Sequence, residues 1–338
     1  MALFHRYGEN RDLGDIPGEH GLPILGTSLK QLRDQPSFRN QMKAKYGNIY
    51  WTSSFGRHTI ALLGPDANEL VLMDRERNFS SAGGWSPVLE LLFPNGLLMR
   101  DFQDHRAHRR IMQAAFKQSA MITHVGWLNA GFRAGIEQWP KDGELRVYDT
   151  VKQLTLTAAA NIFLGTPLGP EADRLNQAFL AMVRASVSLV RSPIPGTRMW
   201  RGVRGRAQIG AYLREQIPIR RDSRDTDMFT LLCNAVDDDG RGYTDDDIVD
   251  HMIFLLLAAH ETVTSALTSM IDLLCKHPEW QNALREECRA LEADDGNVPY
   301  EALEGMVKCE WAFKETLRLM PPVPVIPRKT IRATRFEG

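Results

Sequence analysis

Apolar positions recur with a helical period over most of the chain, and strand-like patterns are confined to one short region. Residues 31–46 have a helical pattern. Residues 49–52 and 58–63 are rich in β-branched and aromatic side chains and are joined through a turn at 55–56, so they predict a small hairpin. Neither βα alternation nor a glycine-rich phosphate loop is visible, which argues against a doubly wound nucleotide fold. The pattern predicts a mainly α fold with a small β-sheet region.

The longest apolar helix is predicted to begin after Thr244 and to end before Pro278. Thr244 precedes three aspartates, which is typical of a capping box at the positive end of a helix dipole. Residues 253–259 are apolar on nearly all faces, so we expect this stretch to be buried in the centre of a large domain. His260 and Glu261 interrupt the apolar run, which makes it too short for a membrane span. No transmembrane anchor is therefore expected.

Charge and cysteine usage narrow the class of protein. The chain of 338 residues has 41 basic and 42 acidic side chains, so nothing in its net charge suggests a nucleic-acid partner. The N-terminal residues show no apolar stretch that could act as a signal peptide. The four cysteines form no CxxC pair, which predicts reduced thiols and a cytoplasmic location. They are Cys233, Cys275, Cys288 and Cys309.

Glu261 and Thr262 place an acid and a hydroxyl inside the predicted buried helix, directly after the small residues Ala258 and Ala259. A buried carboxylate must be paired, protonated or hydrated. A threonine within a helix can bond the carbonyl one turn earlier. The pattern is consistent with a groove for a diatomic molecule and a proton relay. Taken alone, it favours the simpler interpretation, a buried helix with a polar kink.

A second signature follows about fifty residues later. Glu315 and Arg318 stand three residues apart on one helix face, where they can form a charge pair. Pro321 and Pro322 then end the helix. An ExxR pair alone is usually an ordinary surface pair. Within Lys-Glu-Thr-Leu-Arg-Leu-x-Pro-Pro, and after an Ala-Ala-x-Glu-Thr helix, it is far more specific.

The order and spacing of these signatures resemble the cytochromes P-450, the haem-thiolate monooxygenases, over almost the whole chain. The leader at 17–26, the helical segment at 104–116 and the Pro327-Arg328 pair are also similar to this family. The resemblance implies one cytochrome P-450 domain over residues 1–338, with haem b as cofactor. Within the family, the sequence most resembles the soluble bacterial type, near the branch that oxidises retinoids and sterols.

The resemblance also implies which side chains hold the cofactor. His105 and Arg109 correspond to the pair on the helix that bonds the haem propionates, and Arg328 corresponds to the strand arginine with the same role. Charge-assisted bonds of this kind are strong. Ala258 and Ala259 would line the dioxygen groove beside the iron. Ala259 stands where the family usually has glycine, which narrows the groove.

Roles in the chemistry follow from the same resemblance. Thr262 would hold activated oxygen by a hydrogen bond and Glu261 would supply protons, so these two are the expected catalytic residues. Glu315 and Arg318 would act in haem seating. The implied reaction inserts one oxygen atom from dioxygen into a lipophilic small molecule, such as a terpenoid, sterol, retinoid or fatty-acid-like compound. Electrons would come from an acidic electron-transfer partner such as a ferredoxin.

Two charged regions allow other interpretations. Asp101, Asp104, His105 and His108 share one helix face and could be read as a metal cluster, although arginines crowd the same turns and would repel a cation. A band of arginines between 198 and 224 is expected to be a solvated surface.

The sequence ends at Gly338, before any Phe-x-x-Gly-x-x-x-Cys-x-Gly loop of the kind that supplies the iron thiolate in this family. None of the four cysteines lies in such a loop, so no metal ligand is assigned. We therefore expect the chain to be the N-terminal four-fifths or so of a functional monooxygenase, a C-terminally truncated P-450 fold that is inactive without the axial cysteine. The alternatives are a haem-free inactive fragment and a helical protein that binds a lipophile.

Overall fold

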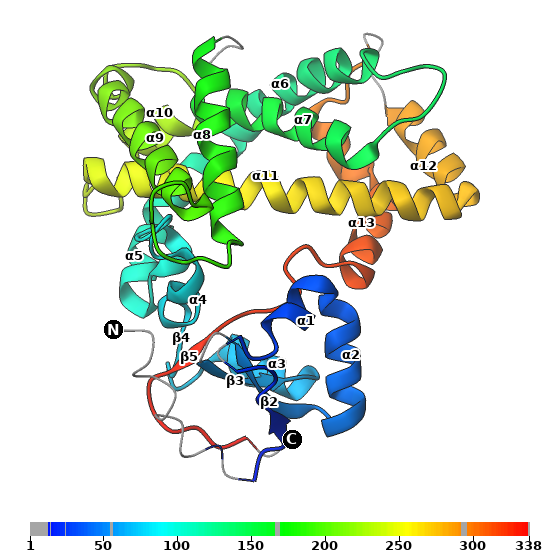
Figure 1. Cartoon of the computed structure of the whole chain (residues 1–338). Coiled ribbons are helices and arrows are strands. Elements are labelled where there is room, and N and C mark those ends of the chain that lie inside the picture. Colours follow the sequence, from blue (N-terminus) through cyan, green and yellow to red (C-terminus); the bar gives the residue numbers. More distant parts are fainter. Residues whose placement is uncertain are drawn as a thin grey trace. The chain divides into compact units, whose positions relative to one another are not determined.

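The computed structural model describes residues 13, 15–23, 25–54, 57–165, 170–291 and 296–336. The hairpin turn expected at 55–56, residue 24 of the leader and the C-terminal Gly338 lie outside these ranges. The chain divides into two compact units. The smaller comprises residues 1–79 and 330–338, and the larger comprises residues 80–329 (Figure 1).

The smaller unit is built on a three-stranded sheet in the order β1-β2-β3. Strands β2 and β3 pair in antiparallel fashion, which confirms the predicted hairpin, while β1 runs parallel to β2. The leader at 17–26 thus contributes the short strand β1. Phe38, Met42 and Tyr50 form the core of this unit. Its elements are β1 (Gly18–Glu19), α1 (Ser28–Arg33), α2 (Gln35–Tyr46), β2 (Ile49–Ser54), β3 (Arg57–Leu62) and α3 (Pro65–Met73).

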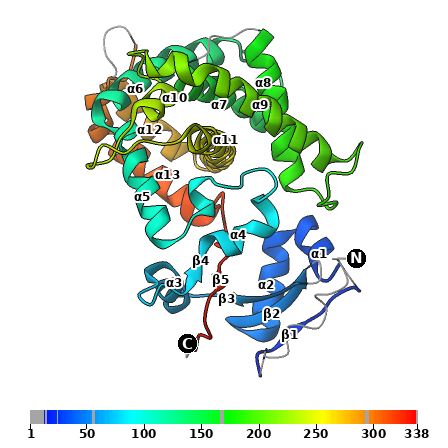
Figure 2. The same cartoon turned by 90° about the vertical axis from the view of Figure 1, so that its left-hand side faces the viewer.

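The larger unit is almost entirely helical, and helix α11 lies at its centre. Figure 1 shows α11 crossing the unit, and Figure 2 looks along its axis with neighbouring helices around it. Strands β4 (Phe79–Ser80) and β5 (Lys329–Thr330) form a second small sheet, and each strand has one residue in each unit. The helices are α4 (Ser81–Leu89), α5 (Phe102–Gln113), α6 (Gln118–Glu137), α7 (Val147–Ala159), α8 (Pro170–Ser186), α9 (Arg198–Arg221), α10 (Met228–Asn234), α11 (Asp245–Lys276), α12 (Pro278–Leu291) and α13 (Val307–Leu319), with short turns at η1 (Leu97–Met99), η2 (Ala114–Phe116), η3 (Ala160–Leu164, a π-helix) and η4 (Tyr300–Gly305).

Both predicted ends of α11 are confirmed. The Thr244 and Asp247 side chains each accept a hydrogen bond from the other's backbone N–H, which is a complete capping box. The helix ends at His277, and Pro278 opens α12. Among the described residues, α11 is the one helix long and apolar enough to cross a membrane. It packs against α7, α9, α10 and α13, as the core helix of a folded domain does.

Helix α11 is buried from Ile248 to Ile253, whereas its middle is only partly buried. Ile248, Met252 and Ile253 are inaccessible to solvent and belong to the main core. Ala258 and Ala259 are only half-buried. The expectation that all of 253–259 is fully buried is therefore wrong at these two positions, although Ala259 still packs against the main core.

The arginine band was expected to be a solvated surface, and for Arg206 and Arg220 this is wrong, because both are largely withdrawn from solvent in ion pairs. Asp245 and Asp246 at the N-terminal end of α11, and Asp250 one turn later, pair with arginines of α9, so charges that are distant in sequence become partners. The pairs are Arg206–Asp250, Arg214–Asp246, Arg221–Asp245 and, with the residue before α10, Arg220–Asp227.

Candidate functional site

The middle of α11 has a buried face and an open face. His260 and Thr264 are 1% and 0% exposed and point toward α7, where the Thr264 hydroxyl lies 2.6 Å from that of Thr155. Val263, on the other side, is 41% exposed. In a helix of 3.6 residues per turn, Ala258, Ala259 and Thr262 share this second side. The small-residue face that the sequence predicted to line a groove is therefore the more accessible one.

Thr262 adopts the geometry that the sequence predicted. Its Oγ1 donates a hydrogen bond to the Ala258 carbonyl one turn earlier, at 2.7 Å. The hydroxyl proton is engaged in this bond, and the oxygen lone pairs remain available as acceptors. The small residue and the hydroxyl are thus joined on the open side of the helix.

Glu261 is paired, which settles the question of how a carboxylate is accommodated in this helix. Its Oε1 accepts a hydrogen bond from Lys152 Nζ of α7 at 3.1 Å and lies 3.2 Å from His260 Nδ1. The pKa of Glu261 is lowered, first by its interaction with His260 and then by Lys152, while burial acts in the opposite direction. The carboxylate is therefore held toward α7. No direct bond to Thr262 is recorded in the described part of the chain.

His105 and Arg109 lie on α5, four residues apart. His105 is half-buried, and its pKa is lowered mainly by burial and then by the neighbouring Arg109 charge. Arg109 is exposed, and none of the described acids forms an ion pair with it. A cation without a carboxylate partner is suited to bind an anionic group of a ligand.

The metal-cluster interpretation of this helix is not supported. Within the described ranges there is no group of three or more side chains that could hold a metal ion. Asp101 instead fixes the start of α4, because its carboxylate accepts hydrogen bonds from Ser80 Oγ at 2.5 Å and from the Ser81 N–H at 2.7 Å. It acts as a cap supplied from outside the helix.

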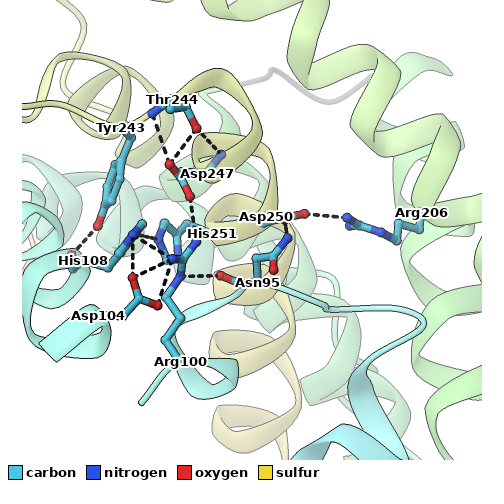
Figure 3. Close-up of polar contacts among 10 residues, drawn as sticks. All are labelled: Asn95, Arg100, Asp104, His108, Arg206, Tyr243, Thr244, Asp247, Asp250 and His251. Atoms are coloured by element: carbon cyan, nitrogen blue, oxygen red, sulfur yellow. Dashed lines mark hydrogen bonds and ion pairs between the residues drawn. The ribbon is translucent and has the colours of Figure 1, made fainter. Parts of the chain in front are cut away.

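A polar network that the sequence analysis did not identify fixes α5 against α11 (Figure 3). Arg100 donates to Asp104 at 3.1 Å and to Asp247 at 2.6 Å, and its Nη1 lies 2.7 Å from His108 Nε2. His108 Nδ1 lies 2.9 Å from His251 Nε2. Asp104 and His108 on α5, and Asp247 and His251 on α11, are each four residues apart. This four-residue spacing is the only sign of the network that can be seen in the sequence.

The contact between Arg100 and His108 determines which atoms of this network donate hydrogen bonds. Arginine can only donate, so His108 Nε2 accepts and His108 Nδ1 carries the proton that it donates to His251 Nε2. Burial, reinforced by the Arg100 charge, lowers the pKa of His108. Burial also lowers the pKa of His251 to about 3. Both rings are therefore neutral at neutral pH.

Glu315 and Arg318 form the predicted pair on α13. Arg318 donates through Nε to Glu315 Oε2 at 2.7 Å and through Nη2 to Oε1 at 2.6 Å, which is a two-point arrangement. Both side chains are more than half exposed. This pair is therefore formed on a surface that the rest of the described chain does not cover.

Arg328 follows α13 on a segment that packs closely onto α4. A Cβ added to Gly84 would lie 2.4 Å from the Pro327 carbonyl oxygen, so only glycine permits this approach. Arg328 Nη1 donates to the same carbonyl at 2.9 Å. The backbone contact at Gly84 thus sets the position of Arg328 in the larger unit.

These residues fit the expected haem on two counts. The macrocycle is flat and apolar, and the open side of α11 offers Ala258 and Ala259 as a small-residue surface. The two propionates are anionic, and Arg109 is a cation with no acidic partner among the residues described. Three of the cysteines have other surroundings: Cys233 is in the core, where burial raises its pKa to about 12, and Cys288 and Cys309 face each other with sulfurs 3.8 Å apart.

A cavity of about 20 Å³ lies among α7, α8, α9 and α11, with Leu156, Phe179, Ile209 and His260 among its lining residues. Such a space accommodates about one water molecule. It is on the buried side of α11, so it is distinct from the open face and too small for a lipophilic substrate.

Comparison with known proteins gives one consistent family. The cytochrome P-450 family profile matches residues 16–338. The chain is 35% identical over 331 residues to cytochrome P-450 136 of Mycobacterium tuberculosis, covering 96% of this chain and 67% of the relative. It is 29% identical over 324 residues to cytochrome P-450 120 of Synechocystis, covering 95% of this chain and 72% of the relative. The structure of cyanobacterial CYP120A1 bound to retinoic acid superposes with a TM-score of 0.84 at 30% identity, covering 96% of this chain and 73% of the other.

Proposed function

Because the chain belongs to the cytochrome P-450 family, we propose that the open face of α11 is its oxygen-activation site and that its substrate is a retinoid-like lipophile. The predicted mainly α fold of this family is confirmed. Cytochromes P-450 are oxidoreductases that hold haem b and use dioxygen and a redox partner to oxidise lipophilic compounds. The family profile spans both compact units, which supports treating residues 1–338 as parts of one domain.

The cofactor would be held from three elements. Ala258 and Ala259 of α11 would contact the macrocycle, while His105, Arg109 and Arg328 would donate to the propionates. Glu315 and Arg318 would act in seating the group. When bound, haem supplies the redox-active iron at which dioxygen reacts. The protein contributes orientation, exclusion of water and the placement of protons.

The observation that carries the proposal is the bond between Thr262 Oγ1 and the Ala258 carbonyl, on the accessible side of the helix. It places a hydroxyl proton beside the small-residue surface. Glu261, one residue before, is ionised and paired with Lys152. We propose that the Thr262 hydroxyl turns from the Ala258 carbonyl and donates a hydrogen bond at the reacting oxygen. Glu261, once released from Lys152 and protonated from solvent, would then replace the proton that is consumed.

The replacement Thr262→Ala tests this role. In the haem-loaded enzyme it should reduce product formed per electron pair by about tenfold or more, with the remaining electrons appearing as reduced oxygen species. Thr262→Ser, which keeps the hydroxyl, is the matched control and should retain most of the coupling. Equal coupling in Thr262→Ala and the wild type would remove Thr262 from the mechanism.

The substrate proposal is supported by two apolar segments at 79–100 and 179–200. Arg191 joins them, since its guanidinium donates to the Ser186 carbonyl at 2.7 Å and to the Pro87 carbonyl at 3.2 Å. Val187 and Ile194 beside it are more than half exposed. Together with the retinoic acid bound by CYP120A1, this supports a retinoid-like ligand. Saturable binding of retinoic acid, but not of a short-chain fatty acid, is the expected result, and absence of saturation would contradict it.

An acidic ferredoxin-like protein is the proposed electron donor. Arg106, Arg109, Arg110 and Lys117 are exposed on and just after α5 and form a basic surface. Electrostatic steering of this kind weakens as ions screen the charges. The rate of reduction by such a partner should therefore fall steeply with ionic strength in the wild type and less steeply in Arg106→Gln. A salt dependence that is the same in both proteins would exclude this surface.

A further inference from the structure

His260 lies beside Glu261 on α11 and is enclosed between two oxygens. It is 1% exposed. Its Nε2 lies 3.4 Å from the Lys152 carbonyl oxygen, and its Nδ1 lies 3.2 Å from Glu261 Oε1. The edge of its ring meets Phe179 of α8, with the ring centroids 5.8 Å apart. These contacts leave the imidazole little freedom to move.

Both oxygens that face the ring can only accept hydrogen bonds, whereas a neutral imidazole has one N–H. The Nε2 contact has the direction of a hydrogen bond, so Nε2 donates to the Lys152 carbonyl. Nδ1 is fully buried and has no well-directed partner, although Oε1 is close. A nitrogen lone pair against a carboxylate oxygen is repulsive, so the arrangement is stable when a proton lies between Nδ1 and Oε1.

Lys152 contributes to this arrangement twice. Its carbonyl receives the His260 ring, and its Nζ donates to Glu261 Oε1 at 3.1 Å. The Tyr148 hydroxyl, one turn earlier on α7, lies 3.4 Å from the same Nζ. Lys152 and Tyr148 of α7 and His260 of α11 are thus the titratable groups that surround the Glu261 carboxylate. One turn of α7 therefore positions both the His260 ring and the Glu261 carboxylate.

We propose that His260 is a positioning residue for Glu261: together with Lys152, it holds the carboxylate against α7 and away from Thr262. The inference rests on the proposed function, since it concerns the acid that serves Thr262. For Glu261 to reach Thr262, its Oε1 must leave both the Lys152 ammonium and the His260 ring. His260 therefore sets how readily the Glu261 carboxylate moves from Lys152 to Thr262.

The state of Lys152 reports on this arrangement without haem. Its pKa is raised through the hydrogen bond to Glu261, which outweighs burial when combined with the other favourable contacts. A lysine released from its carboxylate partner has more free amine at pH 8 and reacts faster with acetic anhydride. The initial acetylation rate of Lys152 is measured by mass spectrometry on the full chain, relative to Lys276, an exposed lysine paired with Asp272.

Three variants make the test specific. His260→Leu should accelerate acetylation of Lys152 by roughly 3- to 10-fold, since one pKa unit corresponds to a tenfold change. His260→Gln keeps an N–H donor and should restore a rate near that of the wild type. His251→Leu removes another fully buried histidine of the same helix that does not contact Glu261 and should leave the Lys152 rate unchanged.

An unchanged Lys152 rate in His260→Leu would overturn the proposal, as would an equal acceleration in His251→Leu. The result is separable from the proposed function, which is tested by Glu261→Gln in the haem-loaded enzyme. If His260→Leu releases Lys152 while Glu261→Gln retains full coupling of electrons to product, the positioning role stands and the proton-supplying role of Glu261 is wrong.

Discussion

Lys152 of α7 and Glu261 of α11 are separated by 109 residues in the sequence and by 3.1 Å between Nζ and Oε1. This pair explains how the central helix carries a charge halfway along its length. Both side chains are about three-quarters removed from solvent, so each charge needs the other to offset its loss of hydration. The same pair directs the Glu261 carboxylate toward α7.

The neutral histidine pair of α5 and α11 makes the protein sensitive to mild acid. The pKa of His251 is about 3 in the folded chain and about 6.5 when unfolded. Below pH 6.5 the unfolded chain takes up a proton that the folded chain refuses, so stability is present above this value and is lost as the pH falls toward 3. His251 alone should cost about 1.4 kcal/mol at pH 5.5.

Urea unfolding at pH 7.5 and at pH 5.5 measures this loss. The pH range lies above the titration of the lowered carboxylates, such as Asp247 and Glu261, so it isolates the histidines. His251→Leu should be less stable than the wild type at pH 7.5 but should lose less on acidification. Parallel losses in both proteins would show that His251 is not the group responsible.

Gly84 should tolerate no side chain. In Gly84→Ala the new Cβ would lie 2.4 Å from a backbone oxygen, which cannot rotate away, so the segment that carries Arg328 must shift. Strain of this kind costs about 1–3 kcal/mol. The matched control is Gly126→Ala on α6, where a Cβ meets nothing within 4 Å and alanine should stabilise the helix slightly. Thermal unfolding of the two variants checks the prediction, and similar midpoints would contradict it.

The Glu315–Arg318 pair on α13 should contribute more to haem binding than to the stability of the fold. Glu315 and Arg318 are exposed, and exposed ion pairs contribute little to stability. Arg318→Ala should therefore leave the thermal midpoint of the haem-free chain almost unchanged while sharply lowering the haem content of the expressed protein. The exposed pair Arg285–Gln281 on α12 offers a control, since Arg285→Ala should alter neither quantity. Full haem content in Arg318→Ala would contradict a role in haem seating and would show that the pair is an ordinary surface contact.

The elements fixed by local chemistry could be predicted from the sequence. The Thr244 cap, the break at His277 and the bond from Thr262 to Ala258 each depend on residues within one or two turns. Partners brought together by packing could not be predicted. The contact between Lys152 and Glu261 has no local signature, because an acid in a helix pairs with whichever helix packs beside it.

The arginines of α9 illustrate the same limit. Their spacing in the sequence is equally typical of a solvated helix face and of a face that forms ion pairs. Their aspartate partners can be identified only from the packing of α9 beside the first turns of α11. The partial exposure of Ala258 and Ala259 could not be predicted from the apolar run alone. An apolar run predicts that a helix is covered, but it does not say which of the neighbouring elements provides the cover.

The central claim is that the haem macrocycle lies against the small-residue face of α11. The most direct test is the ratio of haem to protein absorbance in Ala259→Trp, compared with the wild type and with Ala130→Trp on an exposed position of α6. The account predicts that Ala259→Trp folds but loses most of its haem, because an indole fills the space of the macrocycle, while Ala130→Trp retains wild-type content. A wild-type protein without haem absorbance, or an Ala259→Trp variant with undiminished haem, would contradict it.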